Sequence, residues 1–220
     1  MRISAAGLAK LYGSTVALAG VSVAFAGPGL SLVRGPNGSG KTTLLRILAG
    51  LTTPTAGKVT ISSSTDVRPR LAFVGHAGHL YGELTALENL ELAAHLAGRP
   101  ATDALARLAE LDLVAVAGQR CRRLSAGTQR RVALARGLVA DPDVLFVDEP
   151  FAGVDDMAAD LVADCLVEAR REGRIVIVAS HEMRRSKQVA DRIIELVAGR
   201  LVGTTPSSPA LVMLASELAP

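Results

Sequence analysis

Nine residues near the start of the chain, GPNGSGKTT at positions 35–43, constrain the fold more than any other stretch. They follow a short apolar run at 30–34 and lead into an amphipathic run that starts at Lys41. The spacing matches G-x-x-x-x-G-K-[ST], in which a strand enters a glycine loop and the loop opens a helix. The sequence therefore predicts an α/β fold with a phosphate site formed by Gly35, Pro36, Asn37, Gly38, Ser39, Gly40, Lys41, Thr42 and Thr43.

Two side chains of this loop indicate which phosphate compound it binds. Lys41 is placed to reach the β and γ phosphates of a nucleotide, and Thr42 is placed to put its hydroxyl on a magnesium ion. We therefore expect a nucleoside triphosphate with Mg²⁺ as the ligand, Lys41 as a catalytic residue and Thr42 as a metal ligand.

A second motif, VLFVDEP at 144–150, is an apolar strand that ends in two carboxylates. Asp148 at the carboxyl end of such a strand is expected to bind the magnesium through a water molecule, and Glu149 to take a proton from the attacking water. Two surface carboxylates after a buried strand would be the alternative if the motif stood alone. Beside a phosphate loop, the catalytic interpretation is favoured.

Short apolar strands alternate with helical segments along the chain. Near-continuous apolar runs at 143–150 and 173–180 are typical of central parallel strands, and a helix at 156–172 joins them. Helical patterns over 77–140 predict an inserted lobe, and the segment 203–220 is predicted as a loose tail. Further strands are predicted at 2–8, 17–25, 30–34, 58–62 and 71–75.

Composition narrows the function classes. With 220 residues and 49% hydrophobic content, the chain is long enough for one domain with its own core. Its two cysteines, Cys121 and Cys165, offer at most one pair, so nothing suggests a disulfide scaffold. An arginine cluster is either a solvated helical face or a phosphate-backbone contact, but 3% aromatic residues leave few stacking platforms. The cluster comprises Arg120, Arg122, Arg123, Arg130 and Arg131.

The sequence gives little support for a membrane-spanning segment or a secretory signal. No apolar run reaches the roughly 18 to 20 residues that span a bilayer. The stretch VALAGVSVAFAG at 16–27 resembles a secretory signal, yet Val21, Val23 and Phe25 alternate with small or polar residues, which favours a half-buried strand.

A second helix start, near Ser125, is predicted to face a phosphate group. In LSAGTQRRVALARG at 124–137, Ser125 and the backbone near Gly127 precede a basic helix, which is the build of an anion-binding helix start. One small chain thus carries two such starts far apart in sequence.

In their order, GPNGSGKTT, LSAGTQ, VLFVDEP and a histidine after the next strand, His181, resemble the motifs of ABC transporter ATPases over nearly the whole chain. The resemblance implies an α/β ABC ATPase fold over 1–220: a P-loop NTPase (RecA-like) core, an N-terminal antiparallel β subdomain and the inserted α-helical lobe. It implies an ATPase with ATP and Mg²⁺ as cofactors. It also implies that each ATP lies between the phosphate loop of one subunit and the LSAGTQ turn of a second, so that ATP binding forms a homodimer.

The resemblance also implies roles for residues that match other motif positions of the family. Tyr12 matches the aromatic that stacks on adenine, with a packed aromatic near a turn as the alternative. Asp155 ends AGVD at 152–155, which matches the D-loop, and His181 matches the catalytic switch histidine at the γ-phosphate, with a capping or core histidine as the alternative. Ala126 and Thr128 depart from the commoner Gly and Gln, which puts ATP affinity in doubt.

A finer resemblance is to the haem-exporter ATPase of cytochrome c maturation, in which a histidine, here His76, replaces a glutamine near the γ-phosphate. A neutral imidazole is expected to imitate the glutamine carbonyl through one ring nitrogen. The alternative, a metal site of His76 and His79, lacks a third ligand nearby. An exporter of drugs, lipids or peptides remains open as cargo.

The resemblance implies a partner and a location. The partner is an integral membrane permease, and the chain is expected on the cytoplasmic face of the cell membrane, bound through that permease. A soluble ABC ATPase that acts on DNA or ribosomes is the alternative, but such proteins usually carry duplicated cassettes or long coiled-coil insertions, and this sequence shows neither. A nucleic-acid partner is therefore not expected.

Overall fold

Nine strands form two sheets in the computed structural model, which describes residues 1–63, 67–76, 79–181 and 189–206. One sheet is antiparallel with the order β2-β1-β4, and the other has the order β5-β6-β7-β3-β8-β9, parallel except for β9. The strands are β1 (Arg2–Tyr12), β2 (Thr15–Ala26), β3 (Gly29–Arg34), β4 (Ala56–Ser62), β5 (Leu71–Val74), β6 (Val144–Asp148), β7 (Ile175–Ala179), β8 (Arg192–Val197) and β9 (Arg200–Pro206).

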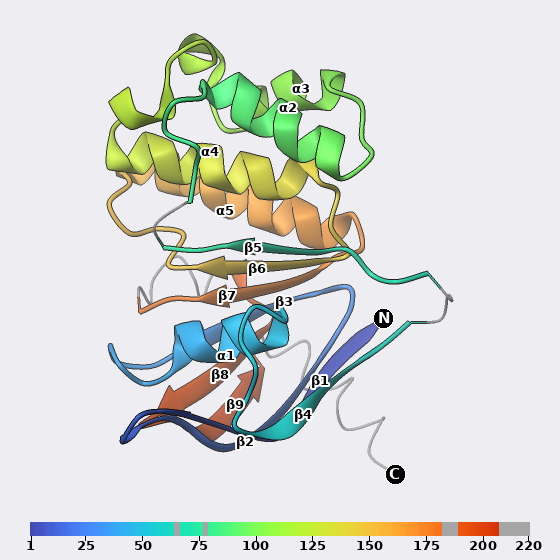
Figure 1. Ribbon diagram of the computed structural model, residues 1–220, viewed down its shortest axis with the longest axis vertical. Coiled ribbons are helices and arrows are strands. Elements are labelled where there is room, and N and C mark those ends of the chain that lie inside the picture. The colour runs from blue at the N-terminus through green and yellow to red at the C-terminus, as the bar shows by residue number, and fades with distance from the viewer. Residues whose placement is uncertain (64–66, 77–78, 182–188, 207–220) are drawn as a thin grey trace.

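Helices cover both faces of the six-stranded sheet (Figure 1). On one face, α1 (Lys41–Leu48) lies with the antiparallel sheet. On the other, α4 (Ala126–Val139) and α5 (Asp156–Arg171) form the layer next to the strands. Outside them are α2 (Ala86–Leu96) and α3 (Thr102–Glu110), and the short 3₁₀ helices η1 (Val114–Val116) and η2 (Cys121–Arg123) join α3 to α4.

The central strands β6 and β7 are buried along their whole length, which confirms their prediction from apolar runs. In β6, Val144 and Phe146 pack into the core with α1, whereas Leu145 and Val147 pack into the core with α4 and α5. Side chains alternate across a strand, so a strand between two cores must be apolar at every position.

The helical segment between β5 and β6 contains α2, α3 and α4, as the pattern over 77–140 predicts. Helix α2 starts with a capping box, in which the Thr85 hydroxyl accepts from the Glu88 N–H and the Glu88 carboxylate accepts from the Thr85 N–H. One apolar cluster runs from the sheet through α4 to α2 and α3. The inserted lobe therefore shares its core with the sheet, so a shift of α4 would also change the packing against the strands.

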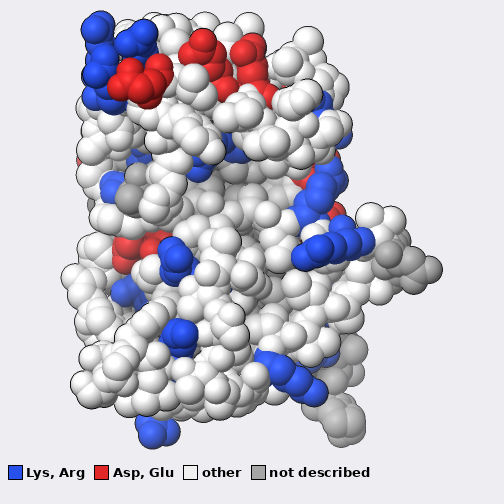
Figure 2. Space-filling view, in the orientation of Figure 1, with Lys and Arg blue, Asp and Glu red and all other residues white. Residues whose placement is uncertain are grey.

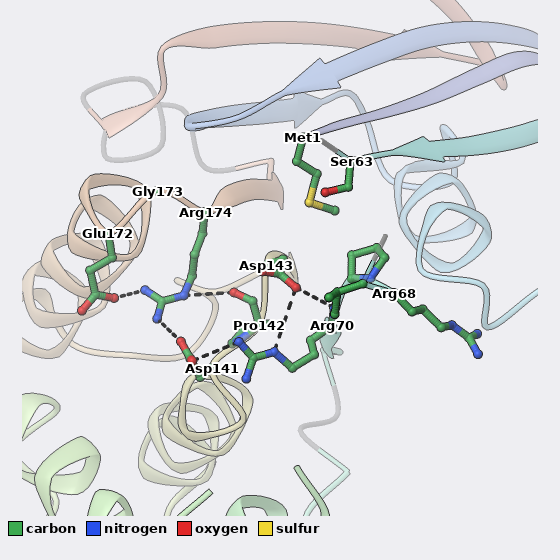
Figure 3. Close-up of a pocket in the computed structure, with 12 residues that line it drawn as sticks. Met1, Ser63, Arg68, Arg70, Asp141, Pro142, Asp143, Glu172, Gly173 and Arg174 are labelled. Carbon is green, nitrogen blue, oxygen red and sulfur yellow. Dashed lines mark hydrogen bonds and ion pairs between the residues drawn. The ribbon is translucent and has the colours of Figure 1, made fainter. Parts of the chain in front are cut away.

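An ion network ties the amino ends of β6 and β7 together, at the edge of the sheet opposite the phosphate loop (Figure 3). Arg174 is 7% exposed and donates to the Asp141 carboxylate at 2.8 Å and to the Pro142 carbonyl at 3.0 Å. Glu172 pairs with the same guanidinium. Burial raises the pKa of Asp141, and its bond from Arg174 with the neighbouring arginine charges lowers it, with a net downward direction. The pocket of about 510 Å³ beside this network holds none of the predicted site residues.

Several boundaries differ from the sequence prediction. Strand β1 continues to Tyr12. The strand predicted at 17–25 is confirmed as β2, which extends over Thr15–Ala26. Strands β8 and β9 were not predicted, and residues 203–206 of the expected tail belong to β9, while 207–220 lie outside the described residues. Within the described ranges, no helix has the length and apolar character needed to cross a bilayer. Both cysteines are buried and free.

Candidate nucleotide site

The carboxyl ends of four neighbouring parallel strands, β5, β6, β7 and β3, bring the predicted motifs to one edge of the sheet. The phosphate loop follows β3 and leads into α1 on one face, whereas the chain after β6 leads into α5 on the opposite face. Ligands of open α/β sheets bind where the connections diverge in this way.

The glycines of the phosphate loop differ in what they do. Gly40 has φ 101°, and a Cβ there would lie 2.4 Å from the Ala17 carbonyl oxygen. Gly38 has φ 79°, but a Cβ there would meet no atom within 4 Å. Gly40 is therefore fixed by a backbone approach within the fold, and Gly38 only by its own conformation.

Replacing Gly40 with alanine is expected to lower the free energy of unfolding by about 2–4 kcal/mol, because a strained φ and a backbone clash add together. The matched control Gly38→Ala should cost only about 1–2 kcal/mol from the left-handed conformation. Urea unfolding followed by circular dichroism measures both. Equal losses in the two variants would show that the Ala17 contact does not constrain the loop.

Lys41 is held inside the loop. It is 6% exposed, and its Nζ donates to the carbonyls of Gly35 at 2.9 Å and Pro36 at 3.2 Å. The carboxylate of Glu149 lies 3.9 Å away. A buried ammonium with two carbonyl partners and a carboxylate at a distance is ready to exchange these partners for phosphate oxygens.

Thr42 and Asp148 form the predicted metal pair. The Thr42 hydroxyl donates to Asp148 Oδ2 at 2.8 Å, and Asp148 is 3% exposed. Burial raises the pKa of this carboxyl, although the bond from Thr42 lowers it. Its Oδ1 is buried and has no hydrogen-bond partner among the described residues. A carboxylate oxygen left open beside a hydroxyl fits a magnesium ion, which takes one or two protein oxygens and completes its shell with water and phosphate.

Glu149 follows β6 in a strained conformation. Its φ is 53°, which is uncommon for a residue other than glycine, and its N–H donates to the Ala179 carbonyl at 2.8 Å. The carboxylate is 14% exposed and lies 2.9 Å from Nδ1 of His181. Strain of this kind clusters at active sites, and here it aims the carboxylate at the residues that follow β7.

These groups line one pocket of about 540 Å³. Thr15, Val16 and Ala17 of β2 also line it, and the sequence analysis did not single them out. The predicted residues that line it are Asn37, Gly38, Ser39, Gly40, Lys41, Thr42, Thr43, His76, Asp148, Glu149 and His181.

Tyr12 lies at the β1–β2 turn, opposite Thr15 in the strand register, and its side chain is 50% exposed. Lys10 Nζ lies 5.0 Å from its ring centroid. The ring is therefore outside the core, at the end of the hairpin that forms one wall of the pocket. Its stacking on adenine stays a prediction.

The second helix start is intact but does not line this pocket. Ser125 caps α4, where its Oγ accepts from the Thr128 N–H at 3.2 Å and lies 2.9 Å from the Thr128 hydroxyl. A Cβ on Gly127 would lie 2.8 Å from the Gly153 carbonyl oxygen, so the turn packs against the segment that matches the D-loop. Asp155 caps α5 by accepting from the Ala158 N–H at 2.8 Å. Within one chain, Gly127 and Asp155 thus have structural roles as well.

His76 and His79 lie in different places. His76 lines the nucleotide pocket, whereas His79 lines a separate pocket with Arg46 and Phe73. In the described part of the chain, no group of three or more His, Cys, Asp or Glu side chains could hold a metal ion, so the two-histidine metal site has no support.

Arg130 is a residue that the sequence analysis treated only as part of the arginine cluster. Its Nη2 lies 3.3 Å from the His76 carbonyl oxygen and 3.4 Å from His76 Nδ1. Other members of the cluster have local partners: Arg120 and Arg122 pair with Glu83, and Arg131 donates to the Leu111 carbonyl. On the face shown in Figure 2, Lys and Arg side chains lie in several separate groups rather than in one continuous patch. These observations favour a solvated helical face over a nucleic-acid surface.

Solved structures of ATP-binding cassettes have the same fold as this chain. The ATP-binding cassette MJ0796, as a dimer in a post-hydrolysis state bound to ADP and Pi, superposes with a TM-score of 0.86 at 27% identity, over 94% of this chain and 99% of that one. A dimeric structure of MJ0796 matches with the same TM-score at 28% identity. The ABC ATPase fold is confirmed.

The names of curated relatives refer to different transport functions. The daunorubicin resistance ATP-binding protein DrrA3 of Streptomyces coeruleorubidus is 36% identical over 91% of this chain. This chain spans only 66% of the length of that relative. The cytochrome c biogenesis ATP-binding export protein CcmA 2 of Cupriavidus metallidurans is 37% identical over 74% of this chain and 81% of its own. The L-cystine transport system ATP-binding protein TcyN of Escherichia coli is 35% identical over 88% and 85%. The haem-exporter resemblance is thus one among several of equal strength.

A family model described as ABC transporter matches residues 18–152, which include the phosphate loop, the LSAGTQ turn and the two carboxylates at the end of β6. The chain therefore belongs to the ABC transporter family, whose ATP-binding cassettes are ATPases.

Proposed function

We propose that two copies of this chain bind two MgATP molecules between them and hydrolyse them to power a separate membrane permease. The observation that carries the proposal is the convergence of Lys41, the Thr42–Asp148 pair and Glu149 in one pocket. The magnesium would supply charge neutralisation for the phosphates when bound between Thr42 and Asp148.

The site residues divide the chemistry between them. Lys41 binds the β and γ phosphates through its ammonium. Glu149 takes a proton from the water that attacks the γ-phosphorus, while the bond from that phosphorus to the bridging oxygen breaks and ADP leaves. His181, whose Nδ1 lies 2.9 Å from Glu149 Oε2, holds the carboxylate and contacts the γ-phosphate.

The second subunit supplies the remaining anion site. Ser125 and Gly127 start a helix whose dipole favours an anion, yet neither lines the pocket of its own chain. A second copy that places this start against the γ-phosphate accounts for both observations. Two positive helix ends attract each other only through the bound phosphate, so hydrolysis releases the pair.

The cargo proposed for first testing is haem, exported for cytochrome c biogenesis. The proposal is supported by the similarity to a cytochrome c biogenesis export protein and by His76, which lines the pocket where a glutamine is commoner in the family. Export of a drug, lipid or peptide is the second candidate, supported by the similarity to a daunorubicin resistance protein. In both, the chain acts from the cytoplasmic face of the membrane while bound to its permease.

Affinity capture from detergent-solubilised membranes of the native host tests this function. The tagged chain, loaded with MgATP, is expected to retain an integral membrane protein, and the purified complex should hydrolyse ATP faster when its cargo is added. Haem and daunorubicin are the first two compounds to compare. Capture of ribosomes or nucleic acid instead, with no membrane protein, would contradict the transport function.

A further inference from the structure

Arg130 joins three segments of the site that are distant in sequence. It projects from the first turns of α4 to His76, two residues beyond the end of β5, and to the D-loop segment. A Cβ on Gly153 would lie only 3.2 Å from Arg130 Nη1. The Arg130 Nε is buried without a hydrogen-bond partner among the described residues. Arg130 is half-buried, and its buried Nε together with the contacts of its two terminal nitrogens restricts where the guanidinium lies.

The contact with His76 involves a particular ring nitrogen. Arg130 Nη2 lies 3.4 Å from Nδ1 and 3.3 Å from the carbonyl oxygen of the same residue. A guanidinium carries only N–H donors and stays protonated, so both of its partners must be acceptors. Burial lowers the pKa of Arg130 and the charge of Glu149 raises it, with a net downward direction. A guanidinium nevertheless stays protonated in proteins. Donation from Arg130 to Nδ1 of His76 requires that this nitrogen carries no proton.

We propose that Arg130 is a positioning residue of the nucleotide site, which selects the His76 tautomer with its proton on Nε2. This inference rests on the proposed function, because it takes the pocket beside His76 to hold the γ-phosphate. With Nδ1 engaged by Arg130, the ring nitrogen left for the pocket is an N–H donor. A donor fits an anionic phosphate oxygen or the oxygen of the attacking water, and it cannot bind magnesium.

The proposal changes the role expected for this histidine. A glutamine can present either its carbonyl oxygen or its amide group, and the sequence analysis expected His76 to imitate the carbonyl. Arg130 removes that option. Because Arg130 belongs to the same helix that Ser125 caps, the position of α4 and the donor offered by His76 are set together.

The tautomer can be read directly by long-range ¹H–¹⁵N correlation NMR of the nucleotide-free chain at about pH 8, above the ordinary histidine pKa of about 6.5. Loss of signals in His76→Gln identifies the His76 ring. The wild-type ring is expected to be protonated on Nε2 alone, and Arg130→Met is expected to give a mixture of tautomers. Arg131→Met is the matched control, since Arg131 lies on the same helix but donates to the Leu111 carbonyl at 2.9 Å. A proton on Nδ1 in the wild type, or an unchanged ring in Arg130→Met, would overturn the proposal.

A double-mutant cycle tests whether the effect reaches turnover. Arg130→Met is expected to lower kcat about three- to tenfold, the range for one hydrogen bond, with a smaller change in KM for ATP. In the His76→Gln background the same substitution should change kcat less than twofold, and Arg130→Lys should restore part of the loss. Equal falls in both backgrounds would show that Arg130 acts on another group. An inactive wild type would contradict the proposed function but leave the NMR result standing.

Discussion

Lys41→Ala is expected to reduce ATP hydrolysis by more than about 100-fold. The ammonium is 6% exposed, and the carbonyl partners that hold it, Gly35 and Pro36, leave its charge free to act on phosphate. Each charge-assisted contact in such a site contributes about 1.5–3 kcal/mol, and the ammonium would contact two phosphates. The variant also loses the cation 3.9 Å from Glu149, so its carboxylate would face the γ-phosphate uncompensated.

Lys58→Ala is the matched control, because this lysine is exposed on β4, away from the pocket. Release of inorganic phosphate is measured for both variants, with circular dichroism to show that each is folded. The assignment of the phosphate site would be wrong if folded Lys41→Ala hydrolysed ATP at the rate of Lys58→Ala.

Glu149→Gln should abolish turnover while leaving MgATP binding intact. The amide keeps the shape of the side chain and loses the base that takes the proton from water, so a fall of about 100-fold or more is expected. Because Lys41, Thr42 and Asp148 are untouched, the variant should hold ATP unhydrolysed and accumulate as a dimer. Titration with a fluorescent ATP analogue and phosphate release separate binding from chemistry. A variant that still turned over ATP at a tenth of the wild-type rate would exclude Glu149 as the principal base.

The phosphate loop and the carboxylates at the end of β6 could be predicted from sequence because each is a continuous motif at a strand end. Parallel strands then bring their carboxyl ends together, so Lys41 and Asp148 meet although they are far apart in the chain. The burial of β6 and β7 followed from the same reasoning, since their apolar runs leave no polar face.

Features that depend on tertiary approach could not be predicted. Arg130 and His76 are separated by 54 positions, and nothing in either local pattern indicates that α4 brings them together. The sequence analysis assigned Gly127 to anion binding alone. It missed the packing role of this glycine, because the Gly153 carbonyl that approaches it belongs to a different loop. Strand β9 was missed because its polar, proline-bearing sequence resembles a linker until β8 offers it an antiparallel partner.

The sharing of ATP between two chains is tested most directly by sedimentation velocity of Glu149→Gln with MgATP. The account predicts a dimer with MgATP and a monomer without it. Adding Ser125→Arg should return the protein to a monomer, because the arginine would fill the turn that meets the partner's γ-phosphate, whereas Ser62→Arg, on exposed β4, should leave the dimer intact. A monomer for Glu149→Gln with MgATP bound, or a dimer that survives Ser125→Arg, would contradict the shared site.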